Sequence, residues 1–338
     1  MRVGWIGLGR LGLPCARALA DAGHEVVGYD AVEATNKTID SRDLTGLAYV
    51  EPGVQDLVNR VGTDVSTGFR VAFDLSEVVR DSDVIFVAVQ TPHAPEYDGT
   101  VPVPWQTRDF EYGYLVQAVR DVARLARGRG EPITLIVVST VLPGTTDRLL
   151  RPLLAGSSVQ LVYSPQFIAM GTAIQDFKNP EFLLLGSDSP SAAGLVSGVF
   201  APVHDAPRVA CTLADAEASK VLYNTAISMR IVWANHVGAI CDATGADADV
   251  VVDTLQLATQ RIVSTAYMRP GMGDGGQCHP RDLIALSDLE RRHDLPPFFQ
   301  ALAELRDAQS RRLADLIARW AKQTGLSMIV VLGRAYKP

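Results

Sequence analysis

The sequence has few cysteines and no long apolar segment. Its four cysteines, Cys15, Cys211, Cys241 and Cys278, are too few and too scattered for a disulfide framework. No apolar run approaches the roughly 20 residues of a membrane-spanning helix. The N-terminus lacks the charged head and the small-residue cleavage site of a signal peptide. We therefore expect a reducing, cytoplasmic setting and no membrane partner.

The chain also lacks an excess of positive charge. Its net charge is −7 over 338 residues, which disfavours nucleic acid as a partner. The histidines show no metal-ligand spacing with one another or with the cysteines, so we expect no catalytic metal. With 47% hydrophobic residues, the composition is that of a globular protein whose length suggests two domains, or two and part of a third.

Much of the chain alternates short apolar runs with helical patterns. Most of these runs are rich in β-branched residues and lack polar alternation, which is typical of parallel strands covered on both faces. The runs are Val3–Ile6, Glu25–Tyr29, Val84–Val89, Thr134–Ser139, Gln160–Tyr163 and Phe182–Leu185. This pattern predicts an α/β fold with a doubly wound, Rossmann-type domain over residues 1–205.

A helical pattern follows the predicted sheet. Between Thr212 and Thr244 there is no proline, and Gly238 is the one glycine. Thr212 with Asp215 resembles a capping box, which marks the start of a helix. We predict one long helix here, within a helical central domain over residues 206–323.

The end of the chain changes pattern again. Gly325 is a helix stop, and Leu326–Leu332 reads as a new buried strand. Such a strand has no partner in a finished domain. We therefore expect residues 324–338 to begin a second α/β domain that is mostly missing.

Three glycines carry the first functional signal. Gly7, Gly9 and Gly12 form a G-x-G-x-x-G pattern that follows one predicted strand and opens a helix, and Asp30 ends the next strand. Glycines there let the backbone approach a pyrophosphate, and the acidic residue binds the adenosine ribose while repelling a 2′-phosphate. The pattern predicts NAD rather than NADP. The structural alternative is a tight packing turn without a ligand.

Polar residues follow two further predicted strands. Thr91 comes after Val84–Val89, and Ser139 and Thr140 stand at the end of Thr134–Ser139. Ligands bind at the carboxyl ends of strands in this fold, so these hydroxyls are candidates for contacts. For Ser139 we favour the structural interpretation, a cap on the next helix.

The predicted long helix carries a polar stripe. Lys220, Asn224, Ser228 and Asn235 fall within an arc of about 80° at helical spacing. Such a stripe either faces solvent or lines a site, and the pattern alone favours solvent.

A glycine-rich loop makes Cys278 a candidate nucleophile. The loop Pro270–Cys278 has four glycines in six residues, which bring backbone donors close to a ligand. Pro280 suits the first position of a following helix, and a thiol beside a helix N-terminus is a better nucleophile. Asp282 lies one turn further on. We interpret the other three cysteines as inert thiols.

Together these motifs resemble the UDP-glucose and GDP-mannose 6-dehydrogenase family, over essentially the whole chain. The matching segments are the fingerprint ending in Asp30, Thr91-Pro92, Ser139-Thr140-Val141, Ser164-Pro165-Gln166-Phe167 with Asp176-Phe177 and Asn179-Pro180, Glu217-Ala218-Ser219-Lys220 with Asn224, Gly273–Cys278 with Asp282, and Gly333–Pro338. The resemblance implies a four-electron oxidation of a sugar C6 alcohol to a carboxylate with two NAD. It also implies a UDP-hexose substrate and a homodimer formed through the central helix.

The resemblance assigns a role to each catalytic candidate. Lys220 and Asn224 would polarise the C6 oxygens as charge develops on them. Cys278 would trap the aldehyde as a thiohemiacetal that is oxidised to a thioester. Asp282 and Lys220 would position water, and Thr140 would assist through a bound water.

It also implies two sets of binding residues. The substrate set is Phe167, Lys220, Asn224, Tyr267, Gly275 and Lys337. The cofactor set is Gly7, Gly9, Gly12, Asp30, Thr91, Thr140 and Arg281, where Arg281 replaces a family lysine.

Two positions depart from the family pattern. Where the family has a glutamate that acts as base in thioester hydrolysis, this chain has Gln166, which cannot accept a proton in that role. Met170 replaces a second glutamate near the cofactor. Two alternatives remain open: a two-electron oxidation like that of β-hydroxyacid dehydrogenases, and a non-catalytic nucleotide-sugar binder.

Overall fold

The computed structural model describes residues 1–60, 68–92, 108–264, 278–326 and 328–330. The chain divides into two compact units, Met1–Thr225 and Ala226–Pro338. No helix of the described segments is both long enough and apolar enough to cross a membrane.

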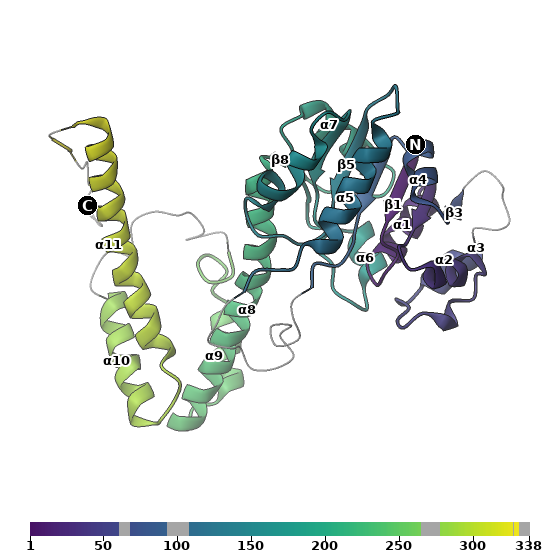
Figure 1. Ribbon diagram of the computed structural model, residues 1–338. Helices are drawn as coiled ribbons and strands as arrows, with labels where there is room; N and C mark the ends of the chain where they lie inside the picture. The colour runs from purple at the N-terminus through teal and green to yellow at the C-terminus, as the bar shows by residue number, and fades with distance from the viewer. Residues whose placement is uncertain (61–67, 93–107, 265–277, 327, 331–338) are drawn as a thin grey trace. The chain divides into compact units, whose positions relative to one another are not determined.

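The first unit is built on one eight-stranded sheet (Figure 1). The strands are β1 (Arg2–Ile6), β2 (Glu25–Tyr29), β3 (Phe69–Val71), β4 (Val84–Val87), β5 (Ile133–Val137), β6 (Val159–Tyr163), β7 (Leu183–Gly186) and β8 (Arg208–Cys211). Their order is β3-β2-β1-β4-β5-β6-β7-β8. All pairs are parallel except β6 with β7, which meet at Tyr163 and Gly186. The predicted doubly wound α/β fold is confirmed.

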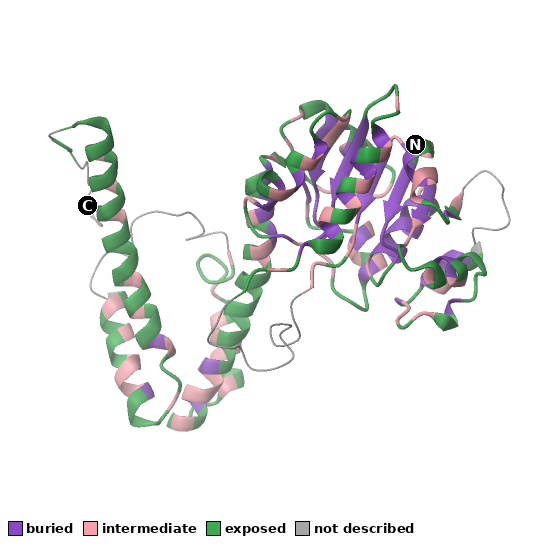
Figure 2. Cartoon of the chain, in the orientation of Figure 1, coloured by how far each residue is buried: buried purple, intermediate pink, exposed green. Residues whose placement is uncertain are grey.

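Helices cover both faces of this sheet, and its central strands are buried (Figure 2). The helices are α1 (Gly12–Asp21), α2 (Glu33–Asp40), α3 (Val54–Arg60), α4 (Leu75–Asp81), α5 (Gly113–Ala126), α6 (Ala173–Lys178) and α7 (Pro190–Phe200), with the short helices η1 (Leu44–Gly46), η3 (Thr146–Leu150) and η4 (Arg151–Leu154). One apolar layer packs α1 and α7 against Trp5 and Phe86. The other packs α4 and α5 against Ile85 and Leu135. Two-sided burial explains why the strands lack polar alternation.

Two strands escape the sequence pattern because they are short and lie at the edges of the sheet. β3 has three residues, and none of the four residues of β8 is fully buried. A half-buried edge strand shows no continuous apolar run. Because β8 follows residue 205, the sheet extends beyond the predicted end of its domain.

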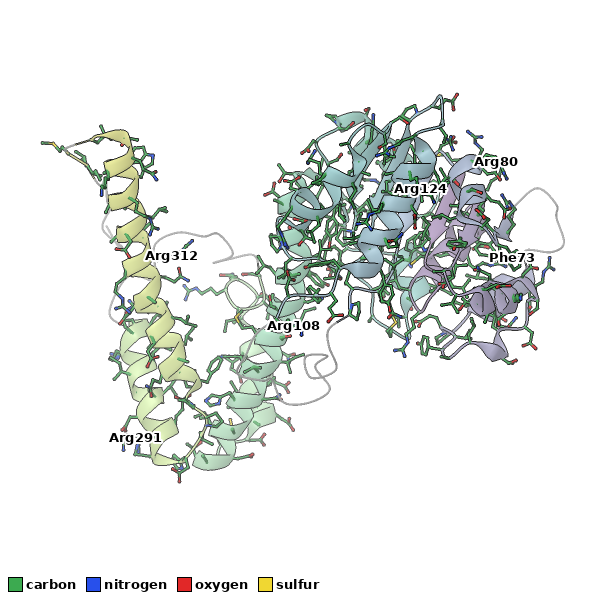
Figure 3. The ribbon with its side chains drawn as sticks, in the orientation of Figure 1. Phe73, Arg80, Arg108, Arg124, Arg291 and Arg312 are labelled. Atoms are coloured by element: carbon green, nitrogen blue, oxygen red, sulfur yellow. The ribbon has the colours of Figure 1, made fainter. Side chains whose placement is uncertain are left out.

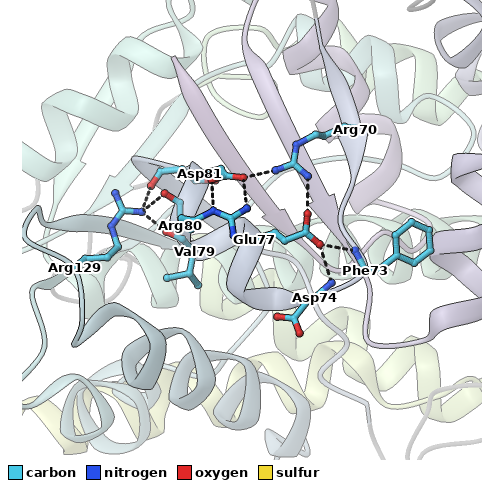
Figure 4. A network of polar contacts seen from close by, with 9 residues as sticks. Arg70, Phe73, Asp74, Glu77, Val79, Arg80, Asp81 and Arg129 are labelled. Atoms are coloured by element: carbon cyan, nitrogen blue, oxygen red, sulfur yellow. Dashed lines mark hydrogen bonds and ion pairs between the residues drawn. The ribbon is translucent and has the colours of Figure 1, made fainter.

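Charged side chains tie α4 to its neighbours (Figure 4). Arg70 of β3 contacts Glu77 at 3.1 Å and Asp81. At the start of α4, Asp74 and Glu77 form a capping box. Arg129 donates to the carbonyl oxygens of residues 79, 80 and 82, which end the helix. Backbone N–H and C=O groups at the two ends of α4 thereby have hydrogen-bond partners.

The second unit is helical. α8 (Leu213–Thr244) begins in the first unit and continues into the second, which also holds α9 (Ala248–Gln256), α10 (Cys278–Arg292) and α11 (Phe298–Thr324). The predicted capping box is present, since Thr212 and Asp215 exchange two hydrogen bonds of 3.2 Å. Gly325 ends α11 at a φ of 67°, so the predicted helix stop is confirmed.

A buried hydrogen bond between two side chains joins helices of this unit. Nε2 of His236, on α8, lies 2.7 Å from Oε1 of Glu290, on α10. The same carboxylate accepts a hydrogen bond of 2.7 Å from the backbone N–H of Phe299 at the start of α11. One side chain of α10 therefore binds both α8 and the start of α11.

The predicted strand Leu326–Leu332 is not formed in its described part. Residues 326 and 328–330 have no strand structure, and the remainder lies outside the described residues. A strand needs a neighbour to complete its backbone hydrogen bonds. None of the described strands pairs with this segment.

The packing of the first turn gives a stability prediction. A Cβ at Gly12 would lie 1.8 Å from the carbonyl oxygen of Gly7, a backbone atom that cannot move aside. We expect Gly12→Ala to lower the free energy of unfolding by about 3 kcal/mol or more. Urea unfolding followed by circular dichroism measures this. Gly9→Ala is the control, because a Cβ there meets nothing within 4 Å. Equal stability of both variants would contradict this account of the turn.

Candidate functional site

The three fingerprint glycines are required for three different reasons. Gly7 has a φ of +94°, and a Cβ there would lie 2.6 Å from the carbonyl oxygen of Ala88. Gly12 lets α1 pack directly against the turn. Around Gly9 there is open space, so a ligand can approach the backbone there. This division of roles is the one expected of a pyrophosphate-binding turn.

Asp30 holds this turn in place. Its carboxylate accepts hydrogen bonds of 2.9 Å from the backbone N–H groups of Leu8 and Val32. The Asn36 side chain and the Asp30 backbone exchange two hydrogen bonds of 2.8 Å. A carboxylate has about four lone-pair sites, so acceptor capacity remains for ribose hydroxyl groups. The position of Asp30 therefore suits the predicted contact with NAD.

A cavity of about 600 Å³ opens beside this turn. It lies at the carboxyl ends of β1, β4, β5 and β6, where the strand order reverses and ligands bind in doubly wound sheets. Its lining residues are Gly9, Arg10, Leu11, Ala88, Val89, Gln90, Thr91, Val138, Ser139, Thr140, Gln166, Ile168 and Lys220. The structure thus brings together Gly9, Thr91, Thr140, Gln166 and Lys220, five residues that the sequence analysis singled out.

Lys220 is the buried cation of this cavity. It is 8% exposed, and its Nζ donates a hydrogen bond of 2.8 Å to the backbone carbonyl of Gln166. The ammonium also lies 4.7 Å from the ring centroid of Phe167, within the range of a cation–π contact. Burial lowers the pKa of Lys220 from its ordinary value. The residues of the polar stripe on α8 therefore differ in exposure. Lys220 is buried and lines the cavity, whereas Asn224 and Ser228 are exposed.

Phe167 is fixed by other aromatic side chains. Its ring centroid lies 4.8 Å from that of Phe182 and 4.7 Å from that of Tyr223. Tyr223 is on α8, three residues after Lys220. The aromatic cluster therefore joins the segment after β6 to the helix that carries the lysine.

The side chain of Gln166 is almost fully buried. Its Nε2 donates a hydrogen bond of 3.2 Å to the carbonyl oxygen of Ser164. The residue thus uses its amide as a donor and its backbone carbonyl as the acceptor for Lys220. Met170, the second departure from the family pattern, is exposed.

The hydroxyl groups after β4 and β5 link these two strand ends. Thr91 donates a hydrogen bond of 2.8 Å to the backbone carbonyl of Thr140. Ser139 donates one of 2.6 Å to the carbonyl of Val89. The interpretation of Ser139 as a helix cap is therefore wrong, because its hydroxyl is taken up by the neighbouring strand end.

Glu217 is a buried anchor to which the sequence analysis gave no role. It is completely buried on α8, and it accepts hydrogen bonds of 2.5 and 2.7 Å from the backbone N–H groups of Gly144 and Thr146. These amides belong to the segment that follows Thr140. Glu217 therefore holds the first turns of α8, including Lys220, against the wall that carries Thr140.

The remaining predicted residues lie in the second unit or outside the described residues. Cys278 is the first residue of α10, so the expected helix is present and begins two residues before Pro280. Arg281 and Asp282 are exposed and pair with each other at 3.2 Å. Tyr267, Gly275, Lys337 and most of the glycine loop lie outside the described residues. Within the described segments, no group of three or more metal-binding side chains occurs.

Comparison with protein families decides the assignment. The model of the UDP-glucose/GDP-mannose dehydrogenase family, NAD binding domain, matches residues 1–204, and that of the central domain matches residues 214–308. The chain belongs to this family. NAD is therefore confirmed as the cofactor, and the turn, the open space at Gly9 and Asp30 are the features of this structure that suit it.

Individual relatives agree with the family assignment. The chain is 30% identical to the GDP-mannose 6-dehydrogenase of Azotobacter vinelandii, over all of this chain and 74% of that protein. It is 29% identical to the UDP-glucose 6-dehydrogenase of Rhizobium meliloti, over all of this chain and 75% of that protein. A ternary complex of GDP-mannose dehydrogenase from Pseudomonas aeruginosa matches with a TM-score of 0.84 and 29% identity, over 94% of this chain and 71% of that one.

The anchor role of Glu217 is testable. Glu217→Ala leaves two backbone donors without their charged acceptor, so we expect it to lower the free energy of unfolding by about 3 kcal/mol. Differential scanning calorimetry measures the loss. Glu131→Ala is the matched control, because Glu131 is exposed and has no such role. If both variants melt like the parent chain, Glu217 is not an anchor.

Proposed function

We propose that this chain oxidises the C6 alcohol of a nucleotide sugar to a carboxylate, as an NAD-dependent nucleotide-sugar 6-dehydrogenase. The observation that carries the proposal is the buried Lys220 in the same cavity as the cofactor turn and Thr140. A buried cation beside a hydride acceptor is suited to stabilise the negative charge that develops on an alcohol oxygen. Bound NAD supplies the hydride acceptor.

The ammonium of Lys220 has the capacity for this role. It has three N–H donors, and in the described structure one of them is bonded to Gln166. The remaining donors can bind the sugar oxygen in both the alcohol and the aldehyde states. Asn224, one helical turn later, is proposed to share this contact, and Thr140 to hold a water beside it. Phe167 would contact the substrate as it packs under the ammonium.

The second half of the reaction is proposed to use Cys278. Its thiolate would add to the aldehyde carbon to form a thiohemiacetal, and transfer of a hydride from that carbon to a second NAD would leave a thioester. Water would then release the carboxylate and restore the thiol, with Asp282 positioning that water. The start of α10 at Cys278 supports this role, because a helix N-terminus stabilises a thiolate.

The proposal also names the nucleotide of the substrate, for which UDP and GDP are the candidates. Sequence resemblance led us to propose a UDP-hexose. The relatives include both GDP-mannose and UDP-glucose 6-dehydrogenases at similar identity, so GDP-mannose is the second candidate. Steady-state kinetics with the two nucleotide sugars compares them directly, and the substrate with the higher kcat/KM identifies the nucleotide.

Removal of the thiol tests the two-step scheme. We expect Cys278→Ser to bind NAD normally but to release one NADH per sugar, where the parent chain releases two, because a serine hydroxyl does not trap the aldehyde. Single-turnover stopped-flow absorbance counts the NADH, with Cys211→Ser as the control. A second NADH from Cys278→Ser would contradict the scheme. A yield of one from the parent chain would favour the two-electron alternative, and a yield of none would favour the binder.

Gln166 gives a prediction about the hydrolytic step. An amide cannot act as general base, and loss of such a base costs a factor of about 10² to 10⁴ in its own step. We expect thioester hydrolysis to limit turnover and the parent chain to accumulate a covalent adduct on Cys278, seen by intact mass spectrometry. Gln166→Glu should speed acid formation, and Gln175→Glu, an exposed position, is the control. Normal acid production without an adduct would show that another group acts as base.

A homodimer through α8 is the proposed assembly. Several large apolar side chains of this helix are exposed in the single chain, namely Leu222, Ile227, Met229, Ile231 and Val232. Such a surface is typical of an interface between subunits.

The assembly is tested by mass in solution. We expect sedimentation equilibrium to give twice the chain mass of 36.4 kDa. The double change Met229→Glu and Ile231→Glu should shift the protein to monomer, because it buries two charges in the proposed contact. Leu195→Glu, at an exposed position on α7, should not. A monomeric parent chain would refute the proposal.

A further inference from the structure

Arg10 is a cation within the cofactor turn that the family assignment does not explain. It stands between Gly9 and Leu11, lines the cavity, and is exposed. Among the described residues Arg10 forms no ion pair, although most arginines on the surface of this unit have a carboxylate partner. Its guanidinium lies over the ring of Tyr49, with 5.3 Å from Cζ to the ring centroid.

The Tyr49 ring that contacts Arg10 is itself held in place by hydrogen bonds. The Tyr49 hydroxyl donates a hydrogen bond of 2.6 Å to Oε2 of Glu51, which is 3% exposed. The other oxygen of Glu51 accepts hydrogen bonds of 2.6 and 2.8 Å from the backbone N–H groups of Gly171 and Ala173. Both oxygens are therefore engaged within the protein. Glu51 holds the tyrosine ring in place without forming an ion pair with Arg10.

The neighbouring helix end also lacks an anion. Among the described residues, the N-cap residue Leu11 makes no side-chain cap hydrogen bond, and the first turn of α1 has no acidic residue. Gly9, Arg10 and the N-cap residue Leu11 all line the cavity, so the positive end of the helix and Arg10 both border it. A phosphate bound there would interact with both, and the planar fork of arginine matches two phosphate oxygens.

We propose that Arg10 is a side-chain ligand of the pyrophosphate of NAD, and that Tyr49 orients it before the cofactor arrives. The proposal rests on NAD binding alone, so it is independent of the substrate and of the chemistry proposed at Cys278. It assigns the affinity for NAD in this chain to one charged side chain as well as to backbone amides.

The proposal predicts a selective loss of affinity. Hydrogen bonds between charged groups contribute substantially to the free energy of binding. Arg10→Gln should therefore raise the Kd of NAD and of ADP-ribose by about 10- to 100-fold. Binding of adenosine, which has no phosphate, should change less than about twofold. Loss of a phosphate contact should also flatten the dependence of the Kd of NAD on salt concentration. Arg10→Lys should recover part of the affinity, since it keeps the charge without the fork.

Isothermal titration calorimetry with NAD and ADP-ribose, and competition with adenosine, provide the measurements. Arg124→Gln is the control for the loss of one positive charge, because Arg124 is an exposed residue of α5, outside the cavity lining (Figure 3). Tyr49→Ala keeps the arginine but removes the ring that orients it, so the Kd of NAD should rise several-fold. An unchanged Kd of NAD in Arg10→Gln would overturn the proposal. So would an equal loss of affinity for adenosine, which would indicate a general disturbance of the turn.

Discussion

Loops line the cavity of the first unit, and a buried loop must find partners for its backbone N–H groups. In this cavity, three carboxylates accept the hydrogen bonds of these N–H groups. Asp30 holds the turn after β1, Glu217 the segment after β5, and Glu51 the segment after β6, and each accepts hydrogen bonds from two backbone amides. The walls that carry Thr140, Gln166 and Gly9 therefore depend on acidic side chains that do no chemistry themselves.

This way of building the site places negative charge behind its walls, although the expected ligands are also anions. Lys220 and Arg10 oppose that charge on the inner side of the cavity. Lys220 is buried and bonded to a carbonyl, whereas Arg10 is exposed and supported by an aromatic ring. The two cations thus stand at different depths, one near the proposed chemistry and one at the cofactor turn.

The sequence was sufficient for features that depend on neighbouring residues. The glycine turn, the capping box at Thr212 and the stop at Gly325 are local, and all three were predicted. The anchors could not be found in this way, because Glu217 binds Thr146 across 71 positions and Glu51 binds Gly171 across 120. For the same reason Ser139 was misjudged, since its acceptor belongs to another strand. Burial of Lys220 likewise follows from packing and not from helical spacing.

Gln166 shows how the backbone constrains what a side chain at one position can do. Its amide is held as a donor to the Ser164 carbonyl, a role that an ionised carboxylate cannot fill. A glutamate in the same orientation would need either a proton or a rotation away from Ser164. The glutamine instead donates a hydrogen bond of 3.2 Å to that carbonyl and so supports the segment after β6. A base acting from this position would require the segment to exchange one hydrogen-bond pattern for another during each turnover.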